Sequence, residues 1–131
     1  MIKMKIVPND SRQVAKVIII DDDGRVLMLK RSNYVDKYAG EWDLPGGHIQ
    51  VGEDFETGMR REVREETSLE IKNPKFVQKL DNLDFYYCSY SGKPIKMSHE
   101  HVGFRFFSGK DLDPNGKFEK VAIKALEMNN D

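Results

Sequence analysis

The residues of this chain best suited to chemistry are three glutamates that follow a glycine-rich loop. They are Glu62, Glu65 and Glu66, and at about 100° per residue they project on or beside the apolar face of a predicted helix. A surface helix normally turns its carboxylates away from its apolar residues. Here the pattern turns three carboxylates toward the body of the protein, where like charges repel and lose hydration unless cations compensate.

A hard divalent cation is the natural compensator for such a cluster. Mg²⁺ prefers oxygen ligands in octahedral geometry, so carboxylates at i, i+3 and i+4 together with a loop carbonyl suit it, and Mn²⁺ is a substitute. The alternative is a solvated helix face, in which the glutamates only pair with the neighbouring arginines Arg60, Arg61 and Arg64.

The elements that position the glutamates are predicted by the stretch from residue 44 to 71, LPGGHIQVGEDFETGMRREVREETSLEI. It begins with a turn signal, Pro45-Gly46-Gly47, and continues without proline through repeated helix formers. We therefore expect a loop from Gly46 to Glu53 and a helix from about Asp54 to Thr67, with Asp54 as its N-cap.

This stretch resembles the signature of the Nudix hydrolases, also called the MutT-like family. The signature asks for Gly, five residues, Glu, seven residues, Arg-Glu-aliphatic, any residue, Glu-Glu, any residue, Gly, aliphatic. The chain supplies Gly47, Glu53, Arg61-Glu62-Val63, Glu65-Glu66 and Leu69 at those spacings. From average residue usage, chance would produce this match at on the order of 10⁻⁸ per register. Ser68 replaces the family's final Gly, and a left-handed Ser there costs about 1 kcal/mol.

The resemblance implies a fold and an activity. The fold is an α/β/α sandwich with a mixed β-sheet, in one domain over residues 1–131. The activity is Mg²⁺-dependent hydrolysis of the diphosphate linkage in a nucleoside diphosphate derivative, with a (deoxy)nucleoside triphosphate as the first choice. The alternatives are hydrolysis of ADP-ribose or a nucleotide sugar, hydrolysis of an RNA end, and a module that binds nucleotides without turnover.

The resemblance also implies roles for individual residues. The metal ligands it assigns are Glu62, Glu65, Glu66, the Gly46 carbonyl and Glu100. Glu62 is the candidate for either general base or further ligand, because it lies one turn before Glu66. Glu53 and Arg61 are expected to form an ion pair that fixes the loop against the helix.

Four residues are candidates for binding the substrate: Arg31, Gly47, Trp42 and Phe118. The Arg31 guanidinium suits a phosphate bidentately, and its alternative is a surface role at a strand end. Trp42 suits base stacking, and its alternative is core packing. His99 and His101 are weak evidence for zinc, because no third ligand accompanies them at a suitable spacing.

Composition narrows the range of partners. A net charge of -1 creates no general positive electrostatic field that would attract nucleic acid or an anionic membrane, so tight nucleic-acid binding is not expected. No apolar run approaches the ~20 residues that span a bilayer, and the N-terminal residues lack the apolar core of a signal peptide. Cys88 is the single cysteine. We expect a cytoplasmic enzyme with a small-molecule nucleotide substrate, and a homodimer is an open alternative.

The remaining segments predict a sheet and a second helix. Val14 to Ile20 is continuously apolar and β-branched, which indicates a central strand covered on both faces. Arg25 to Lys30 follows after a turn, so we expect the two strands to form a hairpin. The other expected elements are an extended segment over 70–80 interrupted at Asn73-Pro74, strands over 83–90 and 101–107, and a helix over 118–128 that closes the back of the sheet.

Overall fold

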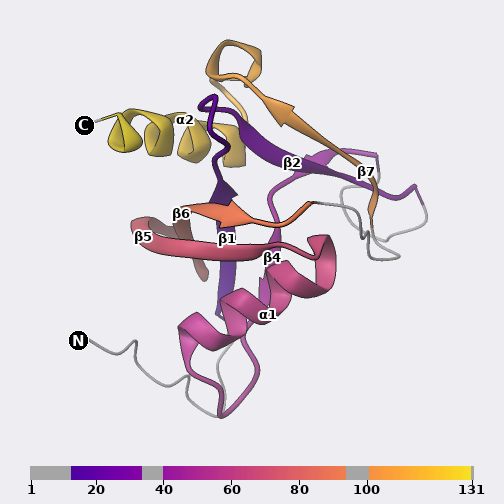
Figure 1. Cartoon of the computed structure of the whole chain (residues 1–131), viewed down its shortest axis with the longest axis vertical. Coiled ribbons are helices and arrows are strands. Elements are labelled where there is room, and N and C mark those ends of the chain that lie inside the picture. The colour runs from indigo at the N-terminus through magenta and orange to yellow at the C-terminus, as the bar shows by residue number, and fades with distance from the viewer. Residues whose placement is uncertain (1–12, 34–39, 94–100, 131) are drawn as a thin grey trace.

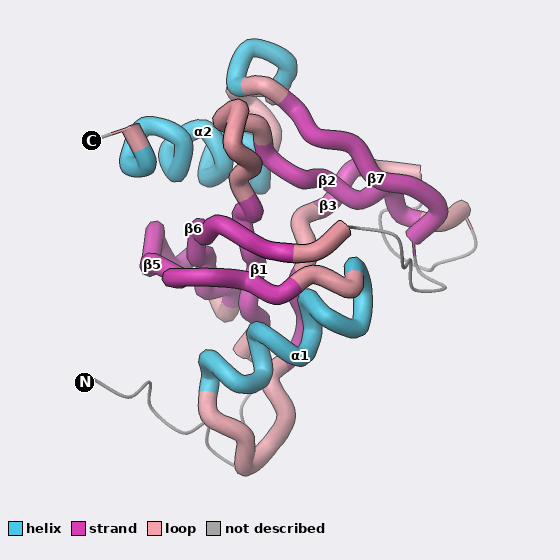
Figure 2. The backbone as a smooth tube through the Cα atoms, in the orientation of Figure 1, coloured by secondary structure: helices cyan, strands magenta, loops and turns pink. Residues whose placement is uncertain are grey.

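Two helices enclose two β-sheets in the computed structural model, which describes residues 13–33, 40–93 and 101–130. Helix α1 (Phe55–Thr67) covers one side of the sheets and helix α2 (Lys117–Asn129) covers the other (Figure 1, Figure 2). The expected α/β/α arrangement is therefore present. Neither helix in the described ranges has the length and apolar character needed to cross a membrane.

The larger sheet is mixed, as the sequence predicts. Its four strands, in spatial order, are β4 (Gly46–His48), β1 (Val14–Ile19), β6 (Leu83–Ser91) and β5 (Glu70–Leu80). Strand β1 runs parallel to β6 and antiparallel to β4. The smaller sheet is antiparallel and contains β3 (Trp42–Asp43), β2 (Val26–Arg31) and β7 (His101–Phe107), in that order. A 3₁₀ helix, η1 (Gly109–Asp111), precedes α2.

Strand β1 lies at the centre of the core because its alternating side chains enter two apolar clusters. One cluster joins β1 to α1 and includes Ala15, Val17, Ile19, Met59 and Val63. The other joins β1 to α2 and includes Ile18, Ile20, Val121, Ala122 and Ala125. Burial on both faces confirms the predicted central strand. By the same alternation, Lys16 projects on the α2 side, in the row of Ile18.

The predicted hairpin of the first two strands is wrong. Residues 20 to 26 do reverse the chain, with the Asp21 amide donating to Arg25 O over 2.9 Å, but β1 and β2 belong to different sheets. An isolated bridge between Ile20 and Val26 is their antiparallel contact. The reason is that both edges of β1 are already occupied by β4 and β6.

Two further segments differ from the prediction. The glycine turn and the start of the expected loop form strand β4, which pairs with β1 in register Lys16 to Gly46. The expected break at Asn73-Pro74 is instead a bulge within one strand, where Asn73 adopts φ 53° and the register with β6 shifts. The loop expected over 31–40 lies partly outside the described residues, at 34–39.

Helix α1 begins and ends as its sequence predicts. Asp54 caps it by accepting from the Thr57 amide at 2.9 Å and from the Thr57 hydroxyl at 2.8 Å. Ser68 ends it with φ 67°, and its amide donates to Arg64 O at 3.0 Å. A left-handed Ser carries the steric cost of its Cβ, which the family's Gly avoids.

Ser68→Gly is therefore expected to raise the free energy of unfolding by roughly 0.5–1 kcal/mol, since relief of the left-handed strain exceeds the added freedom of Gly in the unfolded chain. Urea unfolding measures the change. Ser89→Gly, in strand β6, is the control and should lower stability. A Ser68→Gly protein no more stable than the wild type would contradict the strain at this position.

Candidate active site

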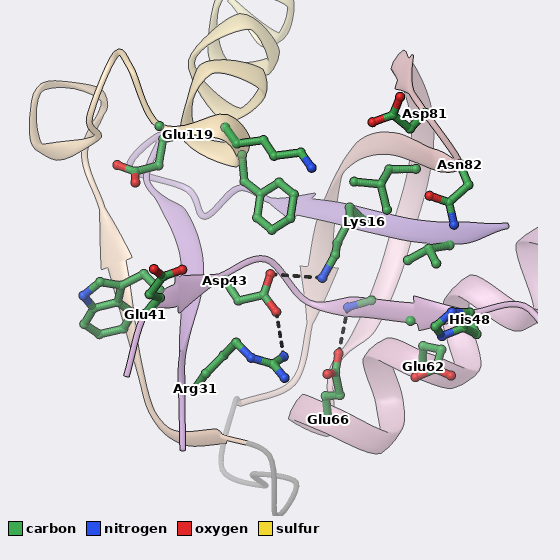
Figure 3. Close-up of a pocket in the computed structure, with 18 of the residues that line it drawn as sticks. Lys16, Arg31, Glu41, Asp43, His48, Glu62, Glu66, Asp81, Asn82 and Glu119 are labelled. Carbon is green, nitrogen blue, oxygen red and sulfur yellow. Dashed lines mark hydrogen bonds and ion pairs between the residues drawn. The ribbon is translucent and has the colours of Figure 1, made fainter. Parts of the chain in front are cut away.

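A cavity of about 1070 Å³ lies where the two sheets meet both helices (Figure 3). Its walls come from β1, the end of β2, β3, β4, the second half of α1, the turn between β5 and β6, and the start of α2. The residues predicted for catalysis or binding that line it are Arg31, Trp42, Gly46, Gly47, Glu62, Glu65, Glu66 and Phe118. The fold therefore brings most of the predicted site residues to one place.

Glu66 is the most deeply placed of the three helix glutamates, with 9% of its surface exposed. The Gly46 amide donates to its Oε1 atom at 2.7 Å (Figure 3). Burial raises the pKa of Glu66 to about 8, although the Gly46 hydrogen bond and the nearby Lys16 ammonium oppose that rise. Its carboxyl group therefore requires a proton or a cation at neutral pH.

Two glycines of β4 allow the helix carboxylates to approach the sheet. Gly46 has φ 137°, and a Cβ on it would lie 1.9 Å from Ala15 O on the neighbouring strand. A Cβ on Gly47 would lie 2.3 Å from Oε2 of Glu62. Any other residue at position 46 would push β4 away from β1, and a side chain at position 47 would displace the Glu62 carboxylate. The glycines serve close contact as well as the turn predicted for them.

Arg61 binds the loop before α1 to the helix. Its guanidinium donates to both oxygens of Glu53, at 2.8 and 3.1 Å, and to His48 O at 3.2 Å. It also donates to Glu62 at 3.1 Å and to Glu65 at 3.0 Å. Its hydrogen bond lowers the pKa of Glu53, and the pKa of Arg61 is raised in turn. The predicted ion pair between Glu53 and Arg61 is present and extends to the helix glutamates.

The three glutamates are not equally turned inward. The side chain of Glu62 is 20% exposed, and burial raises its pKa against the opposing effect of Arg61. The side chain of Glu65 is 56% exposed and points to Arg61, so the expectation that it faces the protein body is wrong. Arg61 supplies a closer positive charge than the interior does.

The donor set in this part of the cavity suits a hard divalent cation. Glu62, Glu65 and Glu66 supply carboxylate oxygens on one helix, and burial raises the pKa of Glu66, so a cation beside it would stabilise its charged form. Within residues 13–33, 40–93 and 101–130, no three acidic, His or Cys side chains already converge on a common point. Rotation of Glu65 away from Arg61 would be needed to complete a ligand set. Glu100, the other predicted ligand, lies outside the described residues.

A second charged cluster, which the sequence interpretation missed, surrounds Asp43 on β3. Its Oδ1 atom pairs with Lys16 Nζ at 3.0 Å and its Oδ2 atom with Arg31 Nη1 at 3.2 Å (Figure 3). The His101 ring lies 3.8 Å from Asp43 and 3.7 Å from Glu66. Burial acts to raise the pKa of Asp43, but His101, Lys16 and Arg31 together outweigh it and lower the pKa to about 2.

One signal in the sequence identifies part of this cluster. Lys16 is the only charged residue in the apolar run of β1, VAKVII, and a charge inside a buried strand must have a partner. Asp43 and His101 carry no comparable signal, because each stands in a short segment of mixed polarity. Arg31 was predicted to bind phosphate, and it lines the cavity while paired to Asp43.

The two predicted aromatic residues stand on different parts of the wall. Trp42 is 36% exposed and packs edge-on against Phe107, with ring centroids 5.1 Å apart. Phe118, at the start of α2, packs against Phe85 at 6.0 Å, and Lys16 Nζ lies 5.2 Å from its ring centroid. Both rings therefore combine core packing with a surface toward the cavity.

Comparison with known proteins places this architecture in a family. A model of the NUDIX domain matches residues 10–127. A MutT-like protein from Streptomyces ambofaciens is 38% identical over 116 residues, covering 84% of this chain and 71% of that protein. An RNA pyrophosphohydrolase from Pelagibacter ubique is 34% identical over 70 residues, covering 53% of this chain and 41% of that protein.

Solved structures support the fold. The crystal structure of an ADP-ribose pyrophosphatase from Streptococcus suis superposes with a TM-score of 0.75, covering 92% of each chain at 24% identity. At that identity the likeness concerns the fold alone. The names of two of these proteins refer to different substrates, RNA and ADP-ribose, so similarity does not select one.

Arg61→Met is expected to lower the free energy of unfolding by about 1–2 kcal/mol, because Glu53, Glu62 and Glu65 lose a shared hydrogen-bond donor. Urea unfolding measures the loss. Arg64→Met is the matched control on the same helix, since it breaks the exposed pair with Glu70, and it should change stability little. Equal effects of the two substitutions would contradict a central role for Arg61.

The metal-free protein is expected to lose stability as the pH rises from about 5 to 8. Glu66 has a higher pKa in the folded than in the unfolded chain, so the folded state binds more protons in that range and the unfolded state is favoured as protons are removed. The loss is on the order of 3 kcal/mol.

Urea unfolding in EDTA at several pH values tests this dependence. Glu66→Gln should remove most of the slope, because the amide does not ionise. Glu65→Gln removes an exposed carboxylate from the same helix and should keep the wild-type slope. If Glu66→Gln keeps that slope as well, another group is responsible for it.

Proposed function

Because this chain belongs to the Nudix family of hydrolases, which act on diphosphate bonds, we propose that it is a Mg²⁺-dependent pyrophosphohydrolase of a nucleoside diphosphate derivative. The preferred substrate is a (deoxy)nucleoside triphosphate. The single observation that carries the proposal is the buried Glu66 carboxylate, held by the Gly46 amide on the wall of a cavity that also contains Lys16 and Arg31. A cavity with these groups suits a polyanion together with a cation.

The metal site in this proposal uses oxygen ligands only. Family members generally use divalent metals. Glu62, Glu65, Glu66 and the Gly46 carbonyl would hold Mg²⁺, or Mn²⁺ in its place, and Glu100 is the further candidate. When bound, the metal supplies positive charge to the diphosphate oxygens and makes water more acidic.

The protein's own groups have separate tasks in this proposal. Glu62 accepts a proton from the attacking water or serves as a further ligand, and its side chain lines the cavity one turn before Glu66. Arg61 and Glu53 hold the glutamates in place from the loop side. Arg31 binds a phosphate oxygen, and Trp42 and Phe118 offer aromatic surfaces to the base.

The substrate class rests on three observations. One relative, which matches 84% of this chain, is named MutT-like, and another, which matches 37% of it, is named nucleoside triphosphatase. The cavity volume of about 1070 Å³ accommodates a small nucleotide. The net charge of -1 does not favour a long RNA.

The single thiol, on buried Cys88, accords with a cytoplasmic enzyme.

Hydrolysis of ADP-ribose or a nucleotide sugar is the second candidate function. A cavity with aromatic rings on separate walls suits a ligand with two bulky ends joined by a diphosphate. Removal of phosphate from an RNA end and binding without turnover are further alternatives. Intact Glu62, Glu65 and Glu66 speak against a module that only binds.

Hydrolysis of a substrate panel with Mg²⁺ tests the proposal. The panel contains nucleoside triphosphates, oxidised guanine nucleotides, ADP-ribose, dinucleotides and triphosphate-ended RNA. We expect turnover of the triphosphates, with a loss of at least about 100-fold in Glu62→Gln and Glu66→Gln. Turnover confined to ADP-ribose would select the second candidate. Nucleotide binding without any turnover would establish a binding module.

Glu65→Gln is expected to lower turnover mainly by weakening the metal site. At limiting Mg²⁺ its rate should fall about 10-fold or more, and a higher Mg²⁺ concentration should restore part of it. Titration of the rate against Mg²⁺ measures the shift. Glu56→Gln, which removes a carboxylate paired with Arg60 on the same helix, is the control. Wild-type activity of Glu65→Gln at limiting Mg²⁺ would show that Glu65 is not a ligand.

A further inference from the structure

The Lys16 side chain reaches the cavity from the central strand. Its Nζ atom lies 5.2 Å from the centroid of the Phe118 ring, and both residues line the cavity together with Glu66 (Figure 3). Its register partner across β1 and β4 is Gly46 itself. A substrate that spans from the carboxylates to Phe118 must therefore pass Lys16.

The contacts of Lys16 leave it able to donate to a ligand. Its Nζ atom donates to Asp43 Oδ1 at 3.0 Å and to Leu44 O at 3.3 Å. An ammonium group has three donors, so these two bonds leave one for the cavity. The side chain is 13% exposed, and its stem is enclosed by protein. The direction of that donor is thus constrained before a ligand arrives.

Lys16 and Arg31 also place positive charge on the cavity wall. Both side chains pair with Asp43, and both line the cavity on the side that faces the glutamates of α1. The positive charge on this wall favours an anion.

We propose that Lys16, together with Arg31 and held in position by Asp43, binds the phosphoryl oxygens of the substrate. Arg31 lies at the end of β2 and Lys16 within β1, so the two cations approach from different sheets. Two donors on separate walls fit successive phosphates of one polyanion. Lys16 is the binding residue and Asp43 is the positioning residue. The proposal takes its ligand class from the proposed function.

Binding without turnover tests the proposal. Trp42 is the only tryptophan of the chain and lines the cavity, so its fluorescence should report occupancy. The probe is inorganic pyrophosphate, added in EDTA, with guanosine as a ligand that carries no phosphate. We expect Lys16→Met to weaken pyrophosphate binding about 10- to 100-fold and leave guanosine binding unchanged. Lys16→Arg should restore part of the affinity.

Two further variants separate binding from folding. Lys117→Met removes an exposed lysine from the same cavity wall and should weaken pyrophosphate binding less than about threefold. Asp43→Asn removes the buried carboxylate, so adding Lys16→Met to it leaves no unpaired buried acid, and the double variant should still bind more weakly than Asp43→Asn.

Three results would overturn the proposal: no pyrophosphate binding by the wild type, unchanged binding by Lys16→Met, or equal losses in Lys16→Met and Lys117→Met. Because this assay requires no hydrolysis, it separates failure of Lys16 from failure of the proposed activity. An inactive enzyme that still binds pyrophosphate through Lys16 would retain this inference.

Discussion

The contact between the Glu66 carboxylate and the Gly46 amide is the constraint on which the rest of the site depends. It requires α1 to lie directly against β4, where Gly46 has no room for a side chain and a side chain on Gly47 would displace the Glu62 carboxylate. Its cost is a buried acid, which the nearby Lys16 charge offsets only in part. The interaction that sets helix against sheet therefore also creates a demand for positive charge in the cavity.

Positively charged side chains lie on two sides of the helix carboxylates. Arg61 neutralises the carboxylates on the loop side of α1, where Glu53 holds it. Lys16 and Arg31 face them from the two sheets, with Asp43 between. In the proposed function, a divalent cation would add positive charge beside the helix carboxylates, and a polyanionic substrate would bind beside Lys16 and Arg31. The same side chains therefore stabilise the fold and serve the proposed chemistry.

Local patterns in the sequence predicted much of this arrangement. The limits of α1, its Asp54 cap and the central strand follow from spacing and side-chain chemistry, and the ion pair of Glu53 with Arg61 follows from the family resemblance. All of them are present. The hairpin was wrong because strand pairing depends on competition among distant segments, and β4 and β6 occupy the edges of β1. The cluster around Asp43 was not predicted for the same reason, since its four members come from four different strands.

The bridge between Ile20 and Val26 is the point where strands β1 and β2 meet. Within the described residues it is the ladder contact that joins the two sheets, and neither residue lines the cavity. Arg31 and Asp43 belong to the smaller sheet, whereas Glu66 bonds to the larger one. The distance between the cations and the helix carboxylates is therefore set by side-chain packing between the sheets and by the Lys16–Asp43 pair, not by a continuous backbone ladder.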